Sequence, residues 1–183
     1  MIYELKLTND YPDSYWFQFK RGEISIVDLM QCQEIHLKNP LIFTLNKKIN
    51  EKRLLSYNIF SSDGPRFISP RLATLLENNE EFVKDVQLLD ATVIINGQSY
   101  DNFKVFNILR TLSSIIDTDK SESTPALDSM PDGPRLFTNI ILRQDVTEDF
   151  WIARCLEYKS CIVISDKLKQ FCIENNIKDI VFE

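Results

Sequence analysis

Short segments in which apolar and polar residues alternate predict several β-strands along the chain. The segment "IYELKL" at 2–7 alternates in this way, and "PLIFTL" at 40–45 begins with a proline. The apolar segments "ATVIING" at 91–97 and "YDNFKVFNIL" at 100–109 flank an Asn-Gly pair, which is typical of a tight β-hairpin turn. Further strand candidates are 135–142 and 150–158.

One helix is predicted together with the residue at which it starts. Ser69 occupies the N-cap position, and Pro70 stands at the first helical position, which proline favours. The next apolar residues follow at spacings of i, i+3 and i+4: Leu72, Leu75 and Leu76. This spacing places the three side chains on one face of a helix.

The segment at 68–90 is repeated in outline at 164–183, near the end of the chain. Ser165 takes the cap position in the second copy, and the apolar face is formed by Leu168, Phe171 and Cys172. Both copies continue with "ENN" and then with a strand-like segment, "VKDVQL" in the first and "IKDIVF" in the second. The repeat is therefore a strand–helix–strand unit. Because neither copy could bury much surface alone, we expect both to lie in one shared core.

Several segments are less regular. The segment 23–35 fits either a short helix or a strand, and both remain open. We expect a polar connector at 46–53, a turn at 61–66 and an exposed loop at 117–134, where Gly, Pro, Ser and charged residues gather. The aromatic run at 15–19 could be a binding platform, but we favour core packing for Tyr15, Trp16, Phe17 and Phe19.

Length and composition indicate one domain over residues 1–183, with a β-rich amino-terminal portion at 1–60 and a second portion at 61–183. A hydrophobic fraction of 44%, with 12 Phe, is enough for a sizeable core. The pattern of elements predicts an α+β fold. We expect a mostly antiparallel sheet with a few short helices, containing the duplicated strand–helix–strand unit.

The formal net charge of -6 argues against nucleic acid as a partner, because phosphates need a basic surface. An acidic protein can instead attract a protein with a basic surface, although solubility alone also explains this charge. No apolar segment approaches the roughly 20 residues of a membrane span, and no signal sequence is apparent. We therefore expect a cytoplasmic protein with no membrane partner. The oligomeric state is left open.

Candidate chemistry is sparse. The four cysteines form no C-x-x-C pair and stand mostly in apolar segments, so we expect reduced thiols. His36 is the single histidine, so we expect no metal site and no cofactor. His36 has no neighbour that would mark it as a catalytic base. Three carboxylate pairs lie in polar segments and are expected to be solvated: Asp117 with Asp119, Glu80 with Glu81, and Glu148 with Asp149. We expect no catalytic residues.

Three stretches share their pattern with a known family. "FISPRLATLLE" resembles its strand and serine-capped helix, and "YDNFKVFNILRTLSSIIDTDKSE" resembles its aromatic strand with the residues Asn107, Asp117, Lys120 and Ser121. The tail resembles the family's ending, with Arg154 and a helix that starts at Ser165. On these grounds residues 62–183 resemble a bacterial family of immunity proteins from polymorphic toxin systems. Many members have a glycine before the last strand, where this chain has Lys178 and Asp179.

The resemblance implies a cytoplasmic protein, without enzymatic activity, that binds and neutralises a cognate toxin. A toxin that acts on nucleic acids would carry a basic cleft, which acidic side chains could fill. The acidic part of the expected loop at 117–134 therefore supplies our candidate partner-binding residues, Asp117, Asp119 and Glu122. The alternative is that these residues only solvate the loop, or that Asp117 pairs with Lys120 and holds it. The alternatives are a small enzyme with a carboxylate-based active site and a regulatory adaptor.

Overall fold

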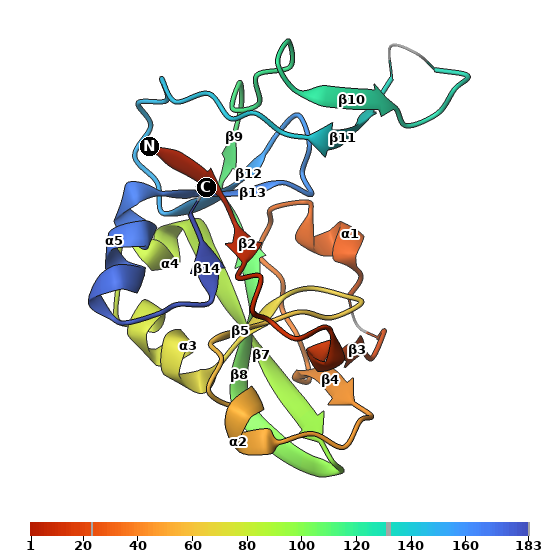
Figure 1. Cartoon of the computed structure of the whole chain (residues 1–183), viewed down its shortest axis with the longest axis vertical. Helices are drawn as coiled ribbons and strands as arrows, with labels where there is room; N and C mark the ends of the chain where they lie inside the picture. Colours follow the sequence, from red (N-terminus) through yellow and green to blue (C-terminus); the bar gives the residue numbers. More distant parts are fainter. Residues whose placement is uncertain (23, 131–132, 183) are drawn as a thin grey trace.

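A computed structural model describes residues 1–22, 24–130 and 133–182 of the chain. Those residues form fourteen strands, β1 to β14, and five α-helices, α1 to α5. Most neighbouring strands are antiparallel, while β4 with β7 and β9 with β12 are parallel. The expected α+β fold is confirmed (Figure 1).

The largest sheet has six strands in the order β3-β4-β7-β8-β6-β5. Their bounds are β3 (Gln18–Phe19), β4 (Leu41–Leu45), β5 (Ile59–Phe60), β6 (Phe67–Ile68), β7 (Val86–Ile95) and β8 (Gln98–Ile108). The two long strands, β7 and β8, form the predicted hairpin. Asn96 and Gly97 make its turn with φ values of 50° and 82°, the left-handed conformation at both positions that a type I′ turn requires.

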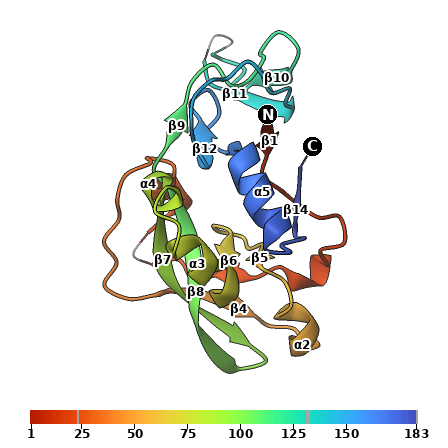
Figure 2. The ribbon, with the colours of Figure 1, turned by 90° about the vertical axis from the view of Figure 1, so that its left-hand side faces the viewer.

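A second sheet has the order β1-β13-β12-β9, and a further pair joins β2 to β14. The bounds are β1 (Ile2–Glu4), β2 (Lys6–Leu7), β9 (Thr111–Leu112), β12 (Ile152–Cys155), β13 (Ile162–Ser165) and β14 (Ile180–Val181). The predicted strand at 2–7 thus divides at Leu5, whose amide N–H donates to the carbonyl oxygen of Ile162 at 2.8 Å. Both ends of the chain are therefore held in the same part of the molecule (Figure 2).

The helices are short, and most begin at a side-chain cap. They are α1 (Ile26–Leu29), α2 (Glu51–Leu54), α3 (Pro70–Glu77), α4 (Phe82–Asp85) and α5 (Asp166–Glu174), with a 3₁₀ turn η1 (Asp13–Tyr15). In α3 the Oγ of Ser69 accepts the N–H of Leu72 at 3.2 Å, as predicted. The open choice within 23–35 resolves to a helix, because Ser25 and Asp28 form a capping box at the start of α1. Glu23 lies outside the described residues.

Two expectations about local structure were wrong. The expected connector at 46–53 overlaps α2, because the side chain of Asn50 caps a helical turn by accepting the N–H of Arg53 at 3.1 Å. The strand expected to begin at Val83 starts only at Val86, and the residues before it form α4. Long-range contacts hold α4: Phe82 is buried against Phe106 and Trp151. Such contacts override the strand-like alternation of the local sequence.

The two copies of the repeat lie in one core, as predicted. The buried side chains of α3 and α5 belong to a single apolar cluster that includes Leu72, Leu76, Leu168 and Cys172. The strands that follow differ, because β7 joins the six-stranded sheet and β14 pairs with β2. The caps differ too: Ser165 makes no side-chain cap in α5, and its hydroxyl donates to the carbonyl oxygen of Trp151 at 3.5 Å.

The aromatic run packs in the core, with one exception. Tyr15, Phe17 and Phe19 are buried in a second apolar cluster beneath the six-stranded sheet, while Trp16 points to solvent. The expected turn at 61–66 packs against this run, and the Oδ1 of Asp63 accepts the N–H of Phe19 at 2.6 Å. Gly64 lies so close to Phe19 that a Cβ atom on the glycine would stand 2.6 Å from the Cβ of Phe19.

Truncation of a buried side chain in α5 tests the shared core. Leu168→Ala should lower the free energy of unfolding by about 2–5 kcal/mol, because it leaves a cavity between the two copies of the repeat. Ile173→Ala on the same helix is the matched control, since Ile173 is 60% exposed. Urea unfolding of both variants decides the matter, and a loss below about 1 kcal/mol for Leu168→Ala would contradict a core position.

A methyl group at Gly64 should also destabilise the fold. Gly64→Ala places its Cβ against the Cβ and ring of Phe19, and relieving such overpacking costs about 1–3 kcal/mol. Gly22→Ala is the control, because the nearest atom to an added Cβ there is the carbonyl oxygen of Lys20 at 3.9 Å. Thermal unfolding should separate the two variants, and equal melting temperatures would mean that the two segments do not approach this closely.

Candidate functional site

A β-hairpin projects from one end of the molecule. Its strands, β10 (Glu122–Pro125) and β11 (Arg135–Asn139), pair only with each other among the described residues. We call residues 117–141 the arm, and Figures 1 and 2 both show its hairpin beyond the four-stranded sheet. The exposed loop expected at 117–134 is thus in part an ordered strand. Pro131 and Asp132, within that expected loop, lie outside the described residues.

Polar contacts shape the arm. Across the hairpin, the guanidinium of Arg135 donates to the Oγ of Ser123 at 2.7 Å and to its carbonyl oxygen at 3.0 Å. At the base, the N–H of Asp117 donates to the carbonyl oxygen of Ile141 at 2.8 Å. A third apolar cluster includes Leu112, Ile115 and Val163. The rings of Phe137 and Tyr158, with centroids 5.4 Å apart, join β11 to this cluster. The arm therefore has little apolar core of its own.

Asp117 holds the base of the arm. Its Oδ2 lies 2.8 Å from the Nζ of Lys120, and its carbonyl oxygen accepts the N–H of Ser121 at 2.9 Å. The hydrogen bond from Lys120 lowers the pKa of the Asp117 carboxyl. The internal pairing considered for Asp117 and Lys120 is therefore present, and Asp117 has a structural task in a turn.

The other two candidate residues are exposed. Asp119 lies in the turn after Asp117, and Glu122 is the first residue of β10. Asp128, which the sequence did not single out, is exposed farther along the arm. Among the residues that the structure describes, three exposed carboxylates therefore lie on the arm and its base: Asp119, Glu122 and Asp128.

Sequence reasoning missed the apolar residues of the arm. Leu127, Met130 and Leu136 are 57%, 52% and 50% exposed. Leu127 and Met130 stand in the expected polar loop and Leu136 in the strand candidate 135–142, so nothing in the sequence marked the three as exposed. Isolated apolar side chains on a surface are ordinary. Three such side chains lie on the arm, and among the described residues its strands β10 and β11 pair only with each other, so their outer edges are open.

The remaining carboxylate pairs are not arranged for acid–base chemistry. Glu81 and Asp149 come together from different segments and both contact the Nζ of Lys167, at 2.9 and 2.7 Å. The hydrogen bond from Lys167 is the largest cause of a lowered pKa at Glu81. A general acid at neutral pH needs the opposite shift. His36 is exposed, away from these carboxylates in sequence.

The cysteines are thiols in apolar surroundings. Cys155, Cys161 and Cys172 are buried, Cys32 is half-buried, and all four are free. Burial raises the pKa of Cys172 to about 12 and raises that of Cys32 as well. Over the ranges that the structure describes, no three His, Cys, Asp or Glu side chains gather as they would around a metal ion.

The residues that carry the family resemblance are mainly structural. Asn107 is fully buried, and its amide donates to the carbonyl oxygen of Gln33 at 2.7 Å and to the Oε1 of Gln87 at 2.8 Å. These bonds fix the segment after α1 against the hairpin β7–β8. Arg154 is buried between the two main sheets, where it lines a cavity.

Comparison with known proteins gives no direct identification. No model of a known protein family matches the chain, and no curated protein matches it either. The resemblance to immunity proteins therefore stays a prediction from the sequence stretches quoted above. Among the described helices, none has both the length and the apolar character needed to cross a membrane.

The reactivity of each cysteine in the native protein should depend on how deeply its thiol is buried. We expect a thiol reagent at neutral pH to modify Cys32 slowly and to leave Cys155, Cys161 and Cys172 unmodified, because only Cys32 is accessible and its pKa is raised. Mass spectrometry should show one label on the native protein and four labels on the denatured protein. A mass two hydrogens below that of four thiols would reveal a native disulfide and contradict this assignment.

Proposed function

We propose that this chain is an immunity protein, which binds a cognate toxin stoichiometrically in the cytoplasm and neutralises it through the arm. The observation that carries this proposal is the exposure of Leu127, Met130 and Leu136 on the arm, whose exposed carboxylates include Asp119 and Glu122. The resemblance of residues 62–183 to immunity proteins supplies the class of partner.

The apolar residues of the arm would provide affinity. Burying one large aliphatic side chain fully is worth about 1.5–3 kcal/mol. An isolated two-stranded hairpin is only marginally stable in water, so contact with a partner would also help to order the arm. The open edges of β10 and β11 could add hydrogen bonds by pairing with an extended segment of the toxin.

The carboxylates of the arm would orient the partner and speed its association. With a net charge of -6 the whole molecule attracts a basic partner, and charges on the arm direct that attraction to the contact surface. A toxin that grips phosphates carries a basic cleft. Asp119 and Glu122 would then occupy sites that normally hold phosphate groups, which blocks the toxin without any chemical step.

Two sets of variants test the apolar and the charged parts separately. The toxin for these tests is the secreted effector whose gene an immunity gene is expected to have beside it. Leu136→Ser should weaken binding at least about tenfold, a loss of about 1.4 kcal/mol, with little effect on folding. Ile173→Ser on α5 is the matched control, since both side chains are exposed. Equal affinities for the two variants would place the contact surface elsewhere than the arm.

Charge reversal addresses steering. Asp119→Lys and Glu122→Lys should slow association with the toxin and reduce the dependence of its rate on salt. Glu174→Lys on α5 is the control for the association rate, because it leaves the charge of the arm unchanged. Association rates at two ionic strengths measure this. Cell survival during toxin co-expression separates neutralisation from the binding that a regulatory adaptor would show, and binding without protection would reject the immunity function.

A further inference from the structure

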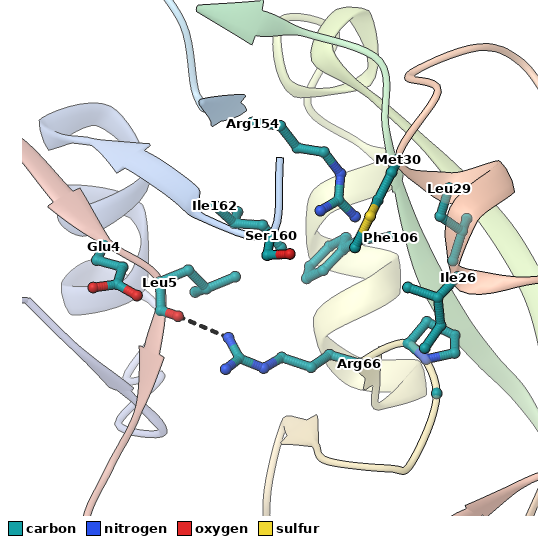
Figure 3. A pocket seen from close by; sticks show the side chains of 12 residues that line it. Glu4, Leu5, Ile26, Leu29, Met30, Arg66, Phe106, Arg154, Ser160 and Ile162 are labelled. Atoms are coloured by element: carbon teal, nitrogen blue, oxygen red, sulfur yellow. Dashed lines mark hydrogen bonds between the residues drawn. The ribbon is translucent and has the colours of Figure 1, made fainter. Parts of the chain in front are cut away.

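A cavity lies between the two main sheets, away from the arm. Its volume is about 210 Å³, and its walls come from the start of the chain, α1, the loop before β6, and the strands β8, β12 and β13. Most of the lining is apolar and includes Leu5, Leu29, Met30, Phe106 and Ile162. Two guanidinium groups, from Arg66 and Arg154, also line it (Figure 3).

Arg154 is 7% exposed, which is unusual for an arginine. Along β12, the neighbours Ala153 and Cys155 face the third apolar cluster, so alternation turns Arg154 towards the cavity. Its Nη1 donates to the carbonyl oxygen of Lys159 at 2.6 Å, but its Nε is buried and has no hydrogen-bond partner within the described structure. Figure 3 shows the guanidinium directed into the cavity.

Arg66 enters from the loop before β6. Its Nη1 donates to the carbonyl oxygen of Leu5 at 2.7 Å, and this is a neutral acceptor. Glu4 is the acidic residue among those that line the cavity, and its Oε2 contacts the Nζ of Lys6 at 3.2 Å. Burial lowers the pKa of both arginines, the direction expected for cations without a close counter-ion.

The charges around the cavity are therefore unbalanced. Two guanidinium groups and one carboxylate line its wall, and no ion pair within 4.0 Å joins either arginine to a carboxylate of the described chain. The other groups that act electrostatically here are the thiol of Cys32 and the side chain of Lys159, which add no negative charge at neutral pH. A buried cation without a partner is costly, and a bound oxyanion would offset that cost.

We infer that this cavity binds a small organic oxyanion, a carboxylate or phosphate monoester with a compact apolar body. Arg154 and Arg66 would hold the oxyanion by charge-assisted hydrogen bonds, for which the planar guanidinium is well suited. The apolar walls around Phe106 and Met30 would hold the body of the ligand. Ser160 adds a hydroxyl group at the wall. This inference is independent of the arm, which contributes no residue to the cavity.

Calorimetric titration of the whole protein with benzoate, phenyl phosphate, inorganic phosphate and benzyl alcohol tests the inference. Benzoate or phenyl phosphate should bind with a millimolar or smaller dissociation constant and raise the melting temperature. Inorganic phosphate lacks the apolar body and benzyl alcohol lacks the charge, so each should bind at least tenfold more weakly. The comparison of benzoate with phenyl phosphate identifies which oxyanion the site prefers.

Three variants connect binding to the arginines. Arg66→Gln and Arg154→Met should each weaken binding of the preferred probe at least tenfold, whereas Arg143→Gln, which removes a surface arginine paired with Asp145, should bind as the unmodified protein does. Arg66→Gln keeps the test valid if Arg154→Met fails to fold. Absence of binding by both organic anions, or binding that neither cavity variant weakens, overturns the inference. A partner's carboxylate found in the cavity of a complex, with no free anion binding, also overturns it.

Discussion

The register of one hairpin, β7–β8, determines how the rest of the chain packs. Near the turn its buried side chains, such as Val93 and Phe103, belong to the cluster beneath the six-stranded sheet, and at the other end Val86 and Ile108 belong to the cluster that holds α3 and α5. A slip of one residue would turn both sets of side chains to the wrong face. The left-handed Asn-Gly turn and a bulge between Ala91 and Val93 exclude that slip.

Local chemistry made this hairpin and helix α3 predictable. The hairpin turn depends on Asn96 with Gly97, and the start of α3 depends on Ser69 with Pro70. The start of β7 was not predictable in the same way. Asp85 ends α4 because its buried carboxylate accepts the N–H of Trp151, far along the chain, at 2.7 Å. The repeat also combines features set by neighbouring residues with features set by long-range contacts. Its helices could be matched from sequence, but the different partners of β7 and β14 depend on the whole fold.

The candidate surfaces were predictable to unequal degrees. An exposed acidic segment could be located from composition, although the pairing of Asp117 with Lys120 and the exposure of Leu136 required the three-dimensional arrangement. Arg66 and Arg154 carry no local signal that connects them, because they arrive at one cavity from different sheets. Surface and cavity also make different physical demands. The proposed partner of the arm would remove apolar area from water, whereas the proposed ligand of the cavity would supply negative charge.

The pairing of the chain's first strands with its last has a consequence for synthesis on the ribosome. β1 pairs with β13 and β2 pairs with β14, so residues 2–7 find their neighbours only after residues 163–181 have been made. Contacts between such distant residues slow folding, because the loop between them must close before the contact stabilises anything. The six-stranded sheet is complete earlier, since all of its strands lie before residue 109. Co-translational folding would therefore begin in that sheet, and β14 would join β2 at a later stage.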